Sequence, residues 1–152
     1  MKNNLTVTFL ICLLMPTQTL ANCSEEAVTE VLSQNGYTYE FIETDDDGDH
    51  FYRVVKDGSQ FTMTAESDGD LSFTKFYNND LGLTNDNAAE VMELYKYLQV
   101  YIDSDGDLAM QYHVAVFGEP RCHSDLSAHV RFYMSLVERA RQYLAALKQG
   151  LD

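Results

Sequence analysis

The chain has 152 residues, with 24 acidic and 10 basic side chains and a formal net charge of −14 at pH 7. A surface this acidic repels the phosphates of nucleic acids and anionic lipids, so nucleic-acid binding is not expected. The length suits one ordinary domain, and the acidic balance suits cations or a basic partner.

Residues 1–21 have the pattern of a secretory signal peptide. A positively charged start precedes an apolar run over residues 5–15 that is too short to span a bilayer, and the small residue Ala21 stands at the cleavage position. We therefore expect a secreted or periplasmic mature chain of 131 residues that begins after Ala21 and has no membrane span. A lipoprotein signal at Cys23 is the alternative, although Asn22 fits that motif poorly.

Three cysteines are present, and Cys12 would leave with the signal peptide. The remaining pair, Cys23 and Cys122, is an even number in an oxidising compartment, which favours one structural disulfide. Closing a loop of about 100 residues would stabilise the fold by up to about 4–5 kcal/mol in the chain-entropy model. Two free thiols or a lipidated Cys23 are the alternatives. A redox-active pair is not expected, because neither cysteine lies in a Cys-x-x-Cys string.

The first element predicted in the mature chain is a short helix. Ser24 can cap it, acidic residues occupy its first turn, and Asn35-Gly36 supplies a left-handed stop. Apolar residues at i, i+3, i+4 spacing form one stripe, made of Val28, Val31 and Leu32.

Four strands are predicted next, over residues 37–41, 51–56, 61–65 and 71–77, because apolar and polar residues alternate there. Strings that contain Asp-Gly join them. Asp-Gly between alternating segments favours a tight hairpin turn, since glycine accepts the positive φ that such a turn requires. This pattern predicts an antiparallel meander with one buried face.

A second helix, capped by Thr84 or Asp86, should carry its apolar stripe over residues 88–95. Alternation then predicts a strand over residues 97–102, a turn at Asp105-Gly106 and another strand over residues 108–117. We expect residues 118–120 to break this strand.

The last predicted element is a long helix that opens at Ser124 or Asp125 and ends near Lys148. The order of helix, four strands, helix, two strands, helix predicts an α+β two-layer domain. Its antiparallel sheet should have about six strands, with the three helices on one side.

This order, together with residues 81–117, resembles the YbjN family, described as bacterial sensory transduction regulators. The most telling stretch is residues 94–108, where a helix end passes into an aromatic strand and an acidic turn. The segment 36–39 followed by the acidic string 45–49 also looks like the family's opening hairpin. The resemblance spans residues 25–147. It implies a fold similar to type III secretion chaperones, which is used for pairing with another protein, and it transfers no catalytic residue.

Three acidic strings, residues 45–49, 67–70 and 103–107, could also be read as calcium loops. An EF-hand loop needs oxygen ligands at positions 1, 3 and 5, glycine at 6 and a bidentate glutamate at 12. Aligning the glycine of each string at position 6 puts another residue at position 12 in all three: Val54, Lys75 and Tyr112. We therefore expect hairpin turns, with no metal ligands and no cofactor. An acidic calcium-binding module at the hairpin tips is the alternative function.

Catalytic motifs are not apparent in the sequence. The four histidines, His50, His113, His123 and His129, form neither a His-x-x-x-His nor a Glu-x-x-His pair. No serine lies in a Gly-x-Ser-x-Gly elbow, and no glycine-rich phosphate loop occurs. We expect a protein without enzymatic activity and without catalytic residues. A small hydrolase that lacks a recognisable motif is a further alternative.

Aromatic residues give the remaining indication of function. Ten Tyr and eight Phe exceed what three helices need to cover one sheet, and tyrosine suits half-exposed interfaces. We therefore predict a secreted or periplasmic protein-binding or regulatory module of YbjN-like type, with a protein partner that is not identified and homodimerisation as one form of pairing.

Overall fold

The computed structural model describes residues 24–115 and 119–149, and for residues 119–124 it describes the backbone alone. Three helices and six strands follow one another in the predicted order: α1 (Glu25–Gln34), β1 (Thr38–Thr44), β2 (His50–Lys56), β3 (Ser59–Ala65), β4 (Asp70–Tyr77), α2 (Asn85–Leu94), β5 (Gln99–Ile102), β6 (Leu108–Ala115) and α3 (Glu119–Gln149). The signal segment, Cys23 and the side chain of Cys122 lie outside the described part, so the cleavage site and the disulfide stay predictions.

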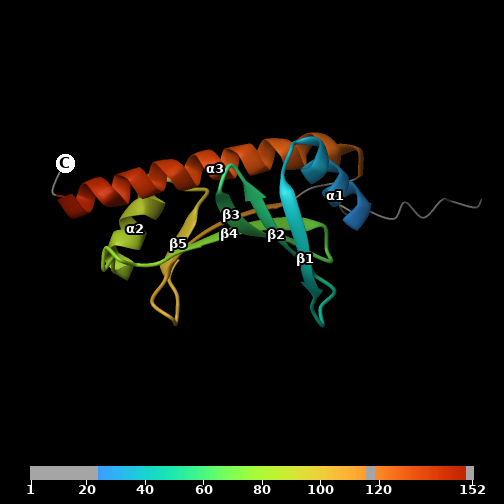
Figure 1. The fold of residues 1–152 in the computed structure, drawn as a ribbon. Helices are drawn as coiled ribbons and strands as arrows, with labels where there is room; N and C mark the ends of the chain where they lie inside the picture. The colour runs from blue at the N-terminus through green and yellow to red at the C-terminus, as the bar shows by residue number, and fades with distance from the viewer. Residues whose placement is uncertain (1–23, 116–118, 150–152) are drawn as a thin grey trace, which may run out of the picture.

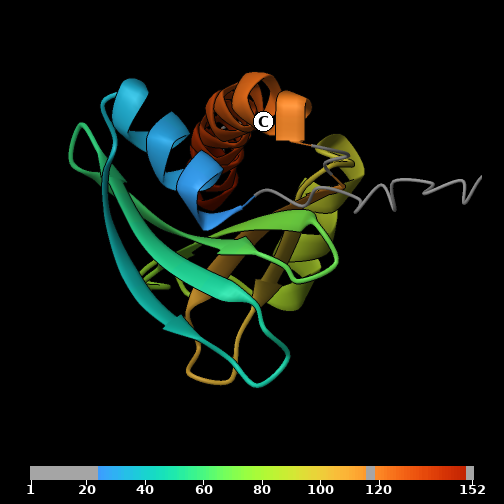
Figure 2. The same ribbon diagram turned by 90° about the vertical axis from the view of Figure 1, so that its right-hand side faces the viewer.

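The six strands form one antiparallel sheet in the order β1-β2-β3-β4-β6-β5. All three helices lie on the same face of this sheet, and α3 extends over the sheet from α1 to α2 (Figures 1 and 2). The predicted two-layer α+β architecture is therefore confirmed. No helix in the described part of the chain is long and apolar enough to cross a membrane.

One row of large side chains crosses five strands on the face that the helices cover. The paired positions in this row are Phe41, Tyr52, Met63, Phe73 and Tyr112. Tyr133 of α3 stacks on this row, with its ring centroid 5.6 Å from that of Phe73. Its hydroxyl donates a hydrogen bond of 2.9 Å to the carbonyl of Met110. The strand register and this contact fix how α3 lies on the sheet.

Local signals set both helix starts that can be compared in detail. The Ser24 side chain accepts a hydrogen bond from the backbone N–H of Ala27 at the start of α1. Thr84, rather than Asp86, caps α2, and it forms a capping box with Asn87. These bonds satisfy backbone donors that have no partner within a helix.

The last helix begins earlier than predicted. α3 starts at Glu119, so Pro120 lies in its first turn instead of separating strand from helix. The prediction of a start at Ser124 or Asp125 was wrong, because proline is tolerated in a first turn, where its missing N–H has no intrahelical acceptor. Positions 116 and 117, predicted as strand, lie outside the described residues.

β5 is shorter than predicted, since it starts at Gln99 and not at Tyr97. The preceding residues make a turn, in which the N–H of Leu98 donates to the carbonyl of Tyr95 at 2.8 Å. Met92, predicted on the buried stripe of α2, is exposed, whereas Ala88 and Val91 are buried.

Candidate functional site

Two of the acidic strings form the same hairpin turn. The first aspartate in each, Asp45 or Asp103, accepts bonds of 2.9–3.0 Å through Oδ1 from the backbone N–H groups two and four residues later. Gly48 and Gly106 take up φ values of +88° and +87°, in the left-handed region. The hairpin prediction is confirmed at both places. Calcium binding at these tips stays an untested alternative.

The remaining acidic string, residues 67–70, forms the turn between β3 and β4, and this turn contacts the β1–β2 turn. The N–H of Ser67 donates to Asp49 Oδ1 at 2.8 Å, which links the β3–β4 turn to the β1–β2 turn. Because neighbouring strands are antiparallel, these two turns lie at one end of the sheet, and the β5–β6 turn lies at the other. Two of the three acidic strings therefore form one acidic corner.

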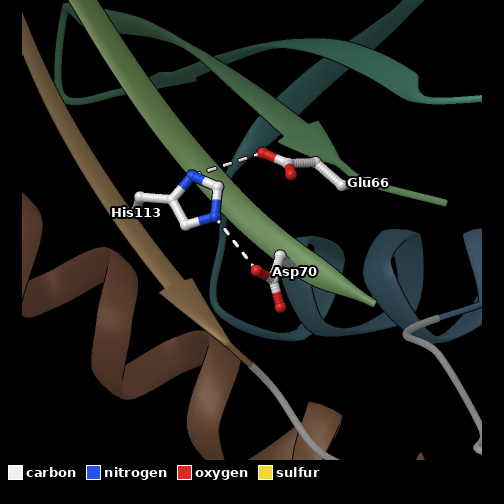
Figure 3. A group of neighbouring side chains, drawn as sticks. All are labelled: Glu66, Asp70 and His113. Atoms are coloured by element: carbon white, nitrogen blue, oxygen red, sulfur yellow. Dashed lines mark hydrogen bonds and ion pairs between the residues drawn. The ribbon is translucent and has the colours of Figure 1, made fainter. Parts of the chain in front are cut away.

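A histidine lies between two carboxylates at this corner (Figure 3). His113 of β6 points Nδ1 at Glu66 Oε1, 3.4 Å away, and Nε2 at Asp70 Oδ2, 3.1 Å away. Glu66 follows β3 and Asp70 begins β4, so three segments meet here. Burial raises the pKa of Glu66, the His113 side chain lowers it, and neighbouring aspartates raise it further.

The geometry of the His113 cluster fits an ion bridge, which forms when the imidazole is protonated. When protonated, imidazole donates through both nitrogens, and each nitrogen here faces a carboxylate oxygen. The three groups also offer ligand atoms within 4.8 Å of one another. An ion bound at Nε2 beside Asp70 would leave Glu66 to hold Nδ1–H, as an outer partner of the imidazole. The ion would then have two protein ligands, so the geometry favours the bridge.

Sequence reasoning named His113 but did not bring it to Glu66 and Asp70. The three residues meet because Asp70 pairs with Ala115 and Ser72 pairs with His113 in the β4–β6 ladder. Only the strand order could have revealed this contact. His129 lies elsewhere, with its Nδ1 2.8 Å from the Tyr112 hydroxyl, and burial lowers its pKa.

A second candidate site is an exposed apolar surface, called here the Tyr97 patch and made of Tyr97 and Phe132. Tyr97 is 71% exposed and Phe132 is 41% exposed. Their ring centroids are 6.1 Å apart in an edge-to-face arrangement. Phe132 also packs on Tyr112 at 5.6 Å. The patch thus joins the turn before β5 to α3, and it rests on the core.

Comparison with protein-family models, with curated proteins and with solved structures finds no match for this chain. The YbjN resemblance therefore stays a prediction, and the functional argument depends on the geometry described above.

Proposed function

We propose that this chain is a secreted or periplasmic protein-binding module that holds its partner on the Tyr97 patch. The observation that carries the proposal is the Tyr97 ring, which is 71% exposed while it packs on Phe132. Aromatic side chains of this kind dominate binding energy at protein interfaces, because they bury a large area and keep a polar tip. The regulatory role that the YbjN resemblance implies would act through this contact.

The patch is held in place before any partner arrives. Rings contact one another from the surface inward, from Phe132 to Tyr112 and from Tyr112 to Phe73 at 5.9 Å. A side chain that is already ordered loses little conformational entropy on binding, so more of its contact energy appears as affinity. Since the chain carries a net charge of −14, a partner with a basic rim around an apolar centre fits best.

Photo-crosslinking tests this proposal. A photoreactive phenylalanine analogue is placed at position 97, and at position 101 as a control. Tyr101 is also an exposed tyrosine, but it alternates with buried Val100 and so faces the side of the sheet without helices.

We expect one recurrent adduct from position 97 in the cell envelope or medium, none from position 101, and loss of the adduct when Phe132→Ser is added. The mass of the adduct distinguishes a second copy of the chain from another protein. No adduct at position 97, or equal adducts at both positions, would refute the proposal.

A further inference from the structure

Basic side chains gather in one place on this acidic molecule. Four of the ten lysines and arginines line two adjoining cavities of about 280 and 260 Å³ between the β2–β3 turn and α3. The cavities share Asp57, Ser59 and Met134, and together they are called here the basic groove. Its four cations are Lys56, Lys75, Arg131 and Arg141.

Strand register and helix periodicity bring these cations together. Lys56 of β2 pairs with Ser59 of β3, and Lys75 of β4 donates a hydrogen bond from Nζ to the Ser59 hydroxyl. These positions continue the face that the helices cover. Arg131 and Arg141 are ten residues apart on α3, which places them about 80° apart around the helix axis and on the same side of the helix. The groove therefore has a strand wall and a helix wall, each with two cations.

Most of these cations have no anionic partner within the described residues. Arg141 pairs with Glu138 at 3.5 Å, but no described carboxylate forms an ion pair with Lys56, Lys75 or Arg131. Arg131 donates to the Ser127 hydroxyl at 2.6 Å, and Lys56 donates to a backbone carbonyl. Four cations against the carboxylates of Asp57 and Glu138 leave the groove with two excess positive charges.

Aromatic rings hold the two ammonium groups. Lys56 Nζ lies 4.5 Å from the centre of the Tyr37 ring, and Lys75 Nζ lies 5.2 Å from that of Tyr77. Such contacts fix a cation without neutralising it. Burial, and then the nearby Arg141, lower the pKa of Lys75, and Glu138 raises it in part. An anion beside Lys75 would relieve this cost.

We propose that the basic groove binds a small oxyanion, a compound whose carboxylate or phosphate groups lie between Lys56 and Arg131 and between Lys75 and Arg141. Guanidinium groups match both kinds of anion with paired hydrogen bonds, and ammonium groups add point charge. Each cavity has room for an anionic group and not for a large ligand. This ligand site is separate from the Tyr97 patch.

Titration of the purified chain with inorganic phosphate and with succinate, followed by amide NMR shifts, tests the proposal. The titrations are made at low ionic strength, with sodium chloride at matched ionic strength as the blank. We expect saturable shifts at Gly58 and Ser59 with a dissociation constant of ~1 mM or lower for at least one probe. The stronger probe identifies phosphate or carboxylate as the preferred group.

Two variants and one matched control make the test specific. Lys75→Met and Arg131→Gln should each weaken binding about tenfold, as expected for one charge-assisted hydrogen bond. Arg139→Gln removes the same charge from an exposed position of α3 that does not line the groove, and it should leave binding unchanged. Arg131 is exposed, so its variant should fold even if Lys75→Met does not. Absence of saturation with both probes, or equal weakening by Arg139→Gln, would overturn the proposal.

Discussion

Two buried tyrosines should respond in opposite ways to the same substitution. Tyr52 and Tyr133 are both fully buried in the core. The Tyr133 hydroxyl donates to the carbonyl of Met110, whereas the Tyr52 hydroxyl has no hydrogen-bond partner among the described residues. Replacing each with phenylalanine keeps the ring and removes one oxygen atom, so the difference between the variants measures the hydroxyl environment.

The magnitudes follow from the cost of burying polar groups. An unsatisfied buried hydroxyl costs about 1–3 kcal/mol, and Tyr52→Phe recovers part of this cost without losing a bond, so we expect a gain of about 1 kcal/mol. The ring keeps its edge-to-face contact with Phe41, at 5.7 Å. Tyr133→Phe loses one hydrogen bond and should cost about 1 kcal/mol. The two variants should therefore differ by about 2 kcal/mol in free energy of unfolding.

Urea unfolding followed by circular dichroism at pH 7 measures this difference. The slope of free energy against urea should stay unchanged, so that the midpoint reports stability alone. If Tyr52→Phe lowers the midpoint as much as Tyr133→Phe does, the Tyr52 hydroxyl has a partner, and the reasoning is refuted.

Substitutions at three further positions test local features. Burial raises the pKa of Glu66 above its ordinary 4.5, so the folded state holds that proton more tightly and loses stability as pH rises above 4.5. Glu66→Gln should reduce this loss in urea titrations between about pH 4 and 7. Burial raises the pKa of Tyr77 from 10.0 to about 12, so the free energy of unfolding should fall as the pH rises from 10 to 12. Thermal unfolding should show a smaller fall for Tyr77→Phe. Gly106→Ala should cost about 1–2 kcal/mol in thermal unfolding, and Gly106→Asn less, because asparagine tolerates positive φ.

Elements set by short-range chemistry were predictable from the sequence. The Asp-Gly turns formed as expected because the carboxylate of Asp45 or Asp103 and the following glycine satisfy the turn within five residues. The cap at Ser24 is equally local. Alternation of apolar residues located all six strands, since one face of each had to be buried.

Boundaries were less predictable where two local signals compete. Proline is compatible both with the end of a strand and with the first turn of a helix, and in the structure Pro120 lies in the first turn of α3. Alternation through Tyr97 favoured a strand, yet the bond between Leu98 and Tyr95 turns the chain there and leaves Tyr97 exposed. Periodicity alone could not have identified Tyr97 as the centre of a surface patch.

The His113 cluster and the basic groove could not be predicted, because each depends on contacts between distant segments. His113 and Asp70 are 43 residues apart and meet only through the β4–β6 register. Lys75 and Arg141 line one cavity because α3 packs on the face of the sheet that carries Lys75. The composition gives only an excess of acidic over basic residues, and it does not show where the ten lysines and arginines lie in the fold.

The acidic corner does not oppose an anion in the basic groove, because the corner and the groove lie at opposite ends of the same strands, whereas the third acidic turn, between β5 and β6, lies at the groove's end. The seven residues of β2 separate the Asp45 turn from Asp57, a strand length of about 20 Å. The Debye length at physiological ionic strength is about 8 Å, so repulsion from the acidic corner is screened before it reaches the groove. The four cations and two carboxylates that line the groove therefore outweigh the acidic corner at this place, and an acidic protein can hold a small oxyanion there.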